Sequence, residues 1–292
     1  MKISIGIPAF NEENNIAKII VKLKEITESI IVCDDGSSDS TAEIAENLGA
    51  IVVKHEKNKG YGAAINSIFK KANEIDSDVL VTFDADGQHR VQDLETILEP
   101  IIENKSDIVI GSRFLDKQSE VPNYRKFGIK VITQVTNASL KEKLTDSQSG
   151  FRAYNKKVLE KIIPSDLGMG ISTEILIKAS KQEMRITEVP IKILYQGDTS
   201  THNPISHGTS VIMSTIKFTS IHNPLKFYGI PGLIFLIIGL GFIGWTIQIY
   251  SIEQSIITNI SLIGIGCVVL GTVLLMTAVI LFSIVTVVNQ RD

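Results

Sequence analysis

The stretch Val79-Leu80-Val81-Thr82-Phe83-Asp84-Ala85-Asp86-Gly87-Gln88-His89 decides the fold that the sequence predicts. Four of its first five residues are apolar and three of the five are β-branched, which is typical of a buried strand. The turn that follows carries oxygen ligands from Asp84, Asp86 and Gln88. Open α/β sheets bind ligands at the carboxyl ends of their strands, and such oxygen atoms suit Mg²⁺ or Mn²⁺, which hold phosphates. The stretch therefore predicts a metal-assisted nucleotide-sugar site.

Two alternative structures fit this stretch in part. An acidic turn after a strand is often only a solvated loop or a helix cap, and the Asp-Ala-Asp pattern alone leaves that alternative open. An EF-hand loop is the second, but it requires glycine at the position of His89 and a helix in place of the strand. The EF-hand is therefore excluded.

Strands and helices alternate on both sides of the stretch. Apolar runs predict strands over residues 3–8, 29–33, 50–53, 79–83 and 107–111, with helices between them, one of which opens on a Ser40/Glu43 capping box. This alternation predicts an α/β fold with a mainly parallel sheet and right-handed crossovers. A nicotinamide-binding fold would require G-x-G-x-x-G after the first strand, and residues 8–12 contain no glycine.

Polar side chains gather at three of the predicted strand ends. They are Asn11 and Glu12 after the first strand, Asp34 and Asp35 after the second, and the acidic turn, residues 84–89, after the fourth. Carboxylates can accept from ribose hydroxyls and base N–H groups, while a metal neutralises a diphosphate. Stabilisation of a helix entry remains an alternative for the second pair. The three strand ends together favour a nucleotide site.

Composition narrows the function classes. The chain has 292 residues, enough for one large or two small domains, and a net charge of −3. That charge, without a basic patch that includes aromatic residues, argues against a nucleic-acid partner. Cys33 and Cys267 both lie in apolar runs and form neither a disulfide framework nor a metal cluster. Met1 leads directly into a strand, so we expect no signal peptide at this end.

The C-terminal part of the sequence is apolar. Residues 227–252 and 254–290 contain no charge, and each run exceeds the roughly 20 residues that span a bilayer. We expect two transmembrane helices, at about 228–250 and 259–288. Lys226 and Arg291 flank them and the hairpin carries only Glu253, which predicts a cytoplasmic N-terminal domain.

Two amphipathic stretches precede these helices. Residues 125–140 carry an apolar stripe of Phe127, Val131, Ile132 and Val135 with basic residues nearby, and residues 206–221 carry a similar one. Such stretches are typical of interfacial helices that lie on a bilayer, although periodicity alone leaves a core-facing position open. We therefore expect a catalytic domain over 1–204, a juxtamembrane interfacial helix over 205–223 and a transmembrane hairpin over 224–292.

Five polar motifs follow one another along the chain. They are Pro8-Ala9-Phe10-Asn11-Glu12, Asp34-Asp35-Gly36-Ser37-Ser38-Asp39, Asp84-Ala85-Asp86-Gly87-Gln88-His89, Gly111-Ser112-Arg113 and Ser149-Gly150-Phe151-Arg152. In this order they resemble the motifs of family 2 glycosyltransferases with the GT-A (nucleotide-diphospho-sugar transferase) fold. The resemblance is to the branch of dolichyl-phosphate mannose synthases and polyprenyl-phosphate glucosyltransferases, and it covers roughly residues 1–200. The Gln-x-x-Arg-Trp element of processive polysaccharide synthases is absent, so a chain-extending synthase is disfavoured.

The resemblance implies a role for each matching residue. Asp146 stands where related transferases carry a base, although here it could instead orient the acceptor or the arginines. For Arg113 and Arg152 a structural ion pair remains the alternative. The implied donor-binding residues are Pro8, Phe10, Asn11, Glu12, Asp35 and Asp84; the metal ligands are Asp84, Asp86 and Gln88; and the acceptor-phosphate residues are Arg113, Arg125 and Arg152.

The expected activity is that of a membrane-anchored, inverting glycosyltransferase that uses Mg²⁺ or Mn²⁺. It would move a hexose from a nucleotide sugar of the GDP-mannose or UDP-glucose type to dolichyl or polyprenyl phosphate, in contact with membrane lipid and without nucleic acid. Transfer to a lipid-linked glycan or a protein, and a nucleotide-sugar binding module without turnover, remain as alternatives. The base, the hexose and the oligomeric state stay open.

Overall fold

The computed structural model describes residues 1–115, 121–193, 220, 224–255 and 257–289. The chain divides into two compact units, Met1–Thr215 and Ile216–Asp292. The domain boundaries expected at residues 204 and 223, and nearly all of the interfacial helix expected over 205–223, lie outside the described residues.

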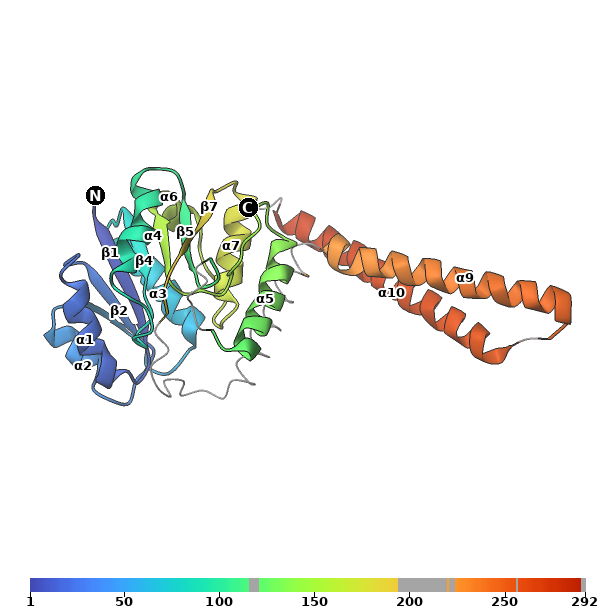
Figure 1. Cartoon of the computed structure of the whole chain (residues 1–292), viewed down its shortest axis with the longest axis horizontal. Helices are drawn as coiled ribbons and strands as arrows, with labels where there is room; N and C mark the ends of the chain where they lie inside the picture. Colours follow the sequence, from blue (N-terminus) through green and yellow to red (C-terminus); the bar gives the residue numbers. More distant parts are fainter. Residues whose placement is uncertain (116–120, 194–219, 221–223, 256, 290–292) are drawn as a thin grey trace. The chain divides into compact units, whose positions relative to one another are not determined.

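The first unit is built on one sheet. Among the described residues it has seven strands in the order β3-β2-β1-β4-β6-β5-β7 (Figure 1). All neighbouring strands pair in parallel except β6, which runs antiparallel between β4 and β5. The predicted mainly parallel sheet is thus confirmed. The strands are β1 Ile3–Ala9, β2 Ile30–Asp34, β3 Ile51–Lys54, β4 Val79–Thr82, β5 Ile108–Ser112, β6 Arg152–Asn155 and β7 Ile186–Pro190.

Helices cover both faces of this sheet (Figure 1). Successive residues of β4 point to opposite faces, so that Val79 and Val81 join one core and Leu80 joins the other. A strand buried on both faces has a continuous apolar run, which is why residues 79–83 carry so clear a pattern. The helices are α1 Glu13–Leu23, α2 Thr41–Asn47, α3 Tyr61–Glu74, α4 Asp93–Ile102, α5 Asn123–Asn137, α6 Lys156–Lys161 and α7 Ile171–Lys181.

The start of α2 corrects the predicted capping box. Ser40 is the N-cap residue, but its side chain makes no capping hydrogen bond. The Thr41 N–H instead donates to Asp39 Oδ1 at 3.0 Å, and the Ser40 N–H donates to the Glu13 carboxylate at 3.1 Å. The Glu13 carboxylate of α1 therefore takes the Ser40 N–H that Glu43 would have bonded in the box, and Asp39 of the preceding loop satisfies the next N–H group.

Helix α5 divides the apolar stripe that the sequence showed. Ile132 is buried, whereas Phe127 and Val131 are 73% and 40% exposed. The buried face also contains Thr133 and Thr136, whose hydroxyls bond within the domain. Part of the stripe is therefore core and part is surface, so neither the interfacial nor the core-facing alternative describes all of it.

The second unit contains the two C-terminal apolar helices that the composition predicted. Helices α9 Ile230–Glu253 and α10 Thr258–Asn289 pack side by side, and a π-helical turn, η1 Leu225–Gly229, precedes α9 (Figure 1). By length and composition each is a candidate membrane span. Glycines allow the close packing: a Cβ added at Gly239 would lie 2.7 Å from the Val268 backbone nitrogen.

Candidate active site

The loops after β1 and β2 are tied together by hydrogen bonds. The Ser38 N–H donates to Asn11 Oδ1 at 2.9 Å, and the Glu12 N–H donates to Thr41 Oγ1 at 2.8 Å. Asn11 has a φ of 56°, a left-handed conformation that asparagine tolerates well. The structure therefore brings the first motif, from Pro8 on β1 to Glu12, beside the second, and leaves the Phe10 ring 37% exposed.

Asp35 is buried and binds the loop that precedes α3. His55 Nδ1 lies 2.6 Å from Asp35 Oδ1, and the Lys59 and Gly60 N–H groups donate to the same carboxylate at 3.0 and 2.8 Å. The carboxylate thus stabilises the entry to α3 rather than the helix that follows it in sequence, α2. The sequence reasoning missed His55, because nothing local links it to a carboxylate twenty residues earlier.

Asp84 begins the acidic turn and is held on both carboxylate oxygens. His89 Nε2 lies 3.1 Å from Oδ2, and the Tyr61 hydroxyl donates to Oδ1 at 3.3 Å. Burial acts to raise the pKa of Asp84, but the hydrogen bond and charge of His89, the Tyr61 bond and the charge of Arg113 together lower it. Asp84 is therefore an anionic carboxylate at neutral pH.

Gly150 of the fifth motif packs directly against this carboxylate. A Cβ added at Gly150 would lie 2.7 Å from Asp84 Oδ2 and 2.7 Å from the Tyr61 hydroxyl oxygen. Its carbonyl oxygen accepts from Thr82 Oγ1 of β4 at 2.6 Å. The third and fifth motifs, which are distant in sequence, therefore form one surface.

The rest of the acidic turn fits a hard divalent cation. The Gln88 N–H donates to Asp86 Oδ1 at 3.0 Å, which fixes the turn. Burial raises the pKa of Glu12, and a hydrogen bond from Asn15 opposes this rise. The negative charges of Asp86 and Asp39 raise the pKa further, which means that the carboxylates here repel one another. Among the described residues no three His, Cys, Asp or Glu side chains form a metal cluster. The carboxylate and amide oxygens of the acidic turn are of the kind that Mg²⁺ takes, usually one or two carboxylates plus water and substrate phosphates.

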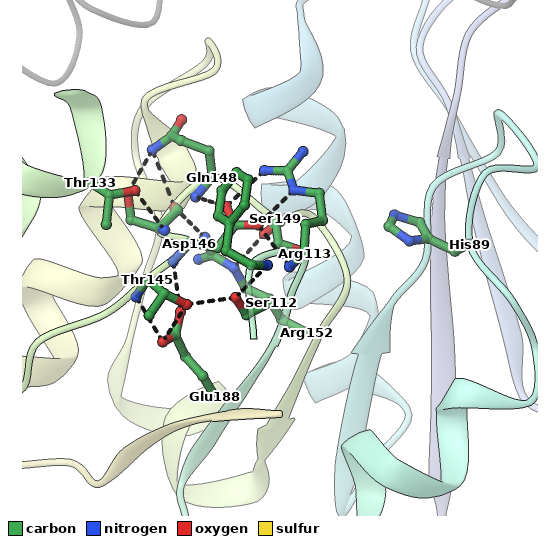
Figure 2. Close-up of polar contacts among 12 residues, drawn as sticks. His89, Ser112, Arg113, Thr133, Thr145, Asp146, Gln148, Ser149, Arg152 and Glu188 are labelled. Atoms are coloured by element: carbon green, nitrogen blue, oxygen red, sulfur yellow. Dashed lines mark hydrogen bonds and ion pairs between the residues drawn. The ribbon is translucent and has the colours of Figure 1, made fainter. Parts of the chain in front are cut away.

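Arg113 and Asp146 form a two-pronged ion pair (Figure 2). Arg113 Nε donates to Asp146 Oδ2 at 2.6 Å and Nη2 donates to Oδ1 at 2.7 Å. Asp146 is fully buried and Arg113 is 15% exposed. Arg113 follows β5, which runs in the same direction as β4, so Arg113 and the acidic turn lie at the same edge of the sheet.

Arg152 does not occupy the place that the resemblance implied. Its side chain is buried, and its guanidinium donates to the carbonyl oxygens of Ser149, Ser172 and Ser147 at 2.7, 2.9 and 2.7 Å (Figure 2). The placement among the acceptor-phosphate residues is therefore wrong for this geometry, because these backbone bonds hold the guanidinium inside the domain. Arg125 lies in the first turn of α5, and its side chain is outside the described residues.

Comparisons with known proteins agree with this arrangement. A family model described as glycosyl transferase family 2 matches residues 4–163. The chain belongs to glycosyl transferase family 2. A family relative from Methanococcus voltae, named UDP-N-acetylglucosamine–dolichyl-phosphate N-acetylglucosaminyltransferase, is 35% identical over 71% of this chain and 89% of its own length. A dolichol-phosphate mannosyltransferase from Pyrococcus furiosus is 35% identical over 65% of this chain and 56% of its own length.

A solved structure confirms the GT-A-type fold of this family 2 member. Glucosyl-3-phosphoglycerate synthase from Mycobacterium tuberculosis, crystallised with UDP, superposes with a TM-score of 0.61. The match covers 75% of this chain and 80% of that one, at 19% sequence identity. At this identity the likeness concerns the fold alone.

Proposed function

We propose that this chain is a membrane-anchored, inverting glycosyltransferase that moves a hexose from a nucleotide sugar to dolichyl or polyprenyl phosphate. The observation that carries the proposal is Arg113, a cation oriented by a fully buried carboxylate at the same edge of the sheet as the acidic turn. Both dolichyl-phosphate transferases among the relatives agree with a lipid phosphate acceptor. Their names give different sugars, so the donor, of the GDP-mannose or UDP-glucose type, is left to experiment.

On the donor side, Pro8, Phe10, Asn11, Glu12 and Asp35 would line the nucleotide pocket. Asp84, Asp86 and Gln88 would hold Mg²⁺ or Mn²⁺. When bound, such an ion stabilises the negative charge that develops on the nucleoside diphosphate as the bond to the anomeric carbon breaks. His89 and Tyr61 keep the Asp84 carboxylate in one orientation before any ligand arrives.

On the acceptor side, the nucleophile needs positioning more than a base. A phosphate monoester has a second pKa near 6, so it is largely ionised at neutral pH. Each oxygen of Asp146 already accepts two bonds. Oδ2 accepts from the Arg113 N–H and from Arg113 Nε, and Oδ1 accepts from Arg113 Nη2 and from the Gln148 N–H. We therefore assign Asp146 the role of orienting Arg113, and Arg113 with Arg125 the role of binding the acceptor phosphate.

The membrane would bring the lipid acceptor to this site. The exposed face of α5 carries Phe127 and Val131 beside the exposed Lys126 and Lys130, a combination suited to an anionic bilayer surface. The two apolar helices would anchor the chain. The positive residues at their outer ends favour a cytoplasmic catalytic domain.

A donor screen tests the proposal. The full-length protein in detergent is given dolichyl phosphate, Mg²⁺ or Mn²⁺, and in turn GDP-mannose, UDP-glucose and UDP-N-acetylglucosamine. We expect one donor to yield a glycosylated lipid and a nucleoside diphosphate, and chelation by EDTA to stop the reaction. The Asp86→Ala variant should lose transfer by at least roughly 100-fold, because metal stabilisation of the leaving group is worth several kcal/mol.

The outcomes separate the alternatives. Donor binding without release of nucleoside diphosphate would indicate a binding module. Transfer only to a lipid-linked glycan or a protein would replace the acceptor but keep the enzyme. Full activity of Asp86→Ala at saturating metal and donor would contradict the metal assignment.

A further inference from the structure

The carboxylate of Glu188, on the strand β7, bonds the backbone beside Asp146 (Figure 2). Its Oε1 accepts from the Asp146 N–H at 2.7 Å, and its Oε2 accepts from the Thr145 N–H at 2.7 Å and from Thr145 Oγ1 at 3.0 Å. One carboxylate therefore fixes two successive peptide units. Such charge-assisted bonds are about twice as strong as bonds between neutral groups.

The place of this carboxylate is electrostatically unfavourable. Burial raises the pKa of Glu188, the bonds from Thr145 and Asp146 lower it, and the negative charge of Asp146 raises it, so that the net pKa is above its usual range. A half-buried acid next to a fully buried one costs stability, so its bonds call for a purpose beyond the stability of the fold.

That purpose concerns Arg113, which the Asp146 carboxylate binds. The Asp146 carboxylate bonds the Nε and Nη2 edge of Arg113 and also accepts from the Arg113 N–H at 3.2 Å. A phosphate that binds Arg113 meets a guanidinium whose orientation is set by Asp146. That orientation follows from where the Asp146 backbone is held.

A second connection joins the same elements. Glu188 lies opposite Ile110 in the parallel pair β5·β7, and Ser112 at the end of β5 bonds Thr145 Oγ1 at 2.6 Å (Figure 2). Arg113 follows Ser112 directly. Thr145 therefore bridges Glu188 to β5, the strand that Arg113 directly follows, and Asp146 bridges Glu188 to the Arg113 guanidinium.

We infer that Glu188 is a positioning residue for the acceptor phosphate, acting through Asp146 on Arg113. The inference rests on the proposed function and adds a residue on β7 to it. In Glu188→Gln one acceptor oxygen becomes an NH₂ group that faces an N–H donor, so the 145–146 backbone must shift. Side chains at such sites must be held within about 0.5 Å of their working position. Mutation of a residue that supports them typically lowers activity by about 10- to 100-fold.

The first measurement separates acceptor use from donor binding. For Glu188→Gln in the full-length protein we expect kcat/KM for dolichyl phosphate to fall by about 10- to 100-fold, while donor affinity by calorimetry stays within about 2-fold. Glu188→Asp, which keeps a carboxylate, should recover part of the loss. The matched control is Glu183→Gln. It removes an exposed acid just before β7 that is paired with the exposed Lys141, and its kcat/KM should match that of the wild type.

The second measurement tests the route through Arg113. In an Arg113→Lys background the two-pronged contact is already lost, so adding Glu188→Gln should lower kcat/KM by less than about 3-fold. If the factors by which Arg113→Lys and Glu188→Gln each lower kcat/KM simply multiply in the double variant, Glu188 has a general structural role and the inference is overturned. Thermal unfolding is recorded alongside, and if Glu188→Gln does not fold, Glu188→Asp carries both measurements.

The failures of the two proposals are distinguishable. An active wild type whose Glu188→Gln variant keeps its acceptor KM and kcat overturns the inference alone. A wild type that neither binds nor glycosylates dolichyl phosphate overturns the proposed function and this inference with it.

Discussion

At the scale of single residues, Gly150 is where the fifth motif meets the acidic turn. A side chain there has no room, because the Cβ would come within 2.7 Å of both Asp84 Oδ2 and the Tyr61 hydroxyl oxygen. The Tyr61 hydroxyl donates to Asp84 Oδ1 and His89 Nε2 contacts Asp84 Oδ2, and these two contacts hold Asp84 in place. Glycine at this position therefore follows from contact with a carboxylate and not from backbone conformation.

We expect Gly150→Ala to displace Asp84 and to lower kcat/KM by about 100-fold, since misplacement of a reacting group by about 1 Å has that effect. Mg²⁺-dependent binding of the nucleoside diphosphate should weaken with it. The measurement is calorimetry with Mg²⁺ and whichever of UDP and GDP the wild type binds, with Gly128→Ala as control, because no described atom lies within 4 Å of a Cβ added at Gly128. Unchanged nucleotide binding by Gly150→Ala would show that Asp84 does not depend on this contact.

At the scale of elements, Asp107 joins three strands at the sheet edge opposite the site. It precedes β5, and its carboxylate accepts from the Arg185 N–H before β7 at 2.8 Å and from Asn155 Nδ2 at the end of β6 at 2.9 Å. Burial acts to raise the pKa of Asp107, but the bonds and charge of Arg185 with the Asn155 bond outweigh it and lower the pKa from 3.8 to about 2. Because the folded-state pKa is the lower one, the ionised carboxylate stabilises the fold above about pH 4, and this stabilisation is lost as the pH falls from about 4 to 2.

Asp107→Asn should therefore lower the free energy of unfolding at pH 7 by about 2 kcal/mol and flatten its dependence on pH between about 4 and 2. Denaturant unfolding at several pH values measures both effects. The control is Asp76→Asn, an exposed acid paired with Lys156, whose effect water and salt should screen. An unchanged slope below pH 4 would contradict the assignment.

The C-terminal hairpin depends on glycine in the same direct way. A Cβ at Gly239 would lie 2.7 Å from the Val268 nitrogen and 2.9 Å from the Gly264 oxygen, whereas at Gly241 no described atom lies within 4 Å. Gly239→Leu should therefore separate α9 from α10 and destabilise the hairpin by about 1–3 kcal/mol, the usual effect of overpacking. Thermal unfolding in detergent, followed by the fluorescence of Trp245 in α9, measures this; equal melting of Gly239→Leu and Gly241→Leu would refute it.

The elements that could be predicted are those with a local signal. The strands β1 to β5 and the two apolar helices are apolar runs of the right length. The carboxyl ends of these five strands meet at one edge of the sheet because the strands run in the same direction. The strand β6 was missed because it begins with Arg152 and ends with Asn155, and a buried arginine contradicts the usual rule that charged residues are exposed. Glu188 and His55 were missed for a similar reason: each acts on a loop that only the folded sheet brings near, 42 and 20 residues away.

At the scale of the whole molecule, the proposed function gives the two units separable roles. The residues proposed for the donor and metal sites lie on strand ends and loops before residue 115. Asp146 and Glu188, which we propose orient Arg113, lie before residue 193, and all of these residues belong to the unit Met1–Thr215. That unit has its own buried cores on both faces of its sheet. The two candidate spans lie in the unit Ile216–Asp292 and, on the proposed function, serve only the lipid.

A chain that ends at His222 tests this division. It keeps the sheet, the acidic turn and the Arg113–Asp146 pair, so we expect it to bind UDP- or GDP-sugar with Mg²⁺ as tightly as the full-length chain, within about 2-fold. It loses the helices that would hold it at the bilayer, so the local concentration of a membrane-embedded acceptor falls. Tethering raises effective concentration into the millimolar range, and its loss should lower transfer to dolichyl phosphate in vesicles by about 100-fold or more. A short-chain phosphate monoester dissolved in water is the matched acceptor, because it needs no tether and both chains should use it equally. Equal rates of both chains on the vesicle acceptor would show that the spans do not deliver the lipid, whereas loss of nucleotide-sugar binding would show that the first unit does not function alone.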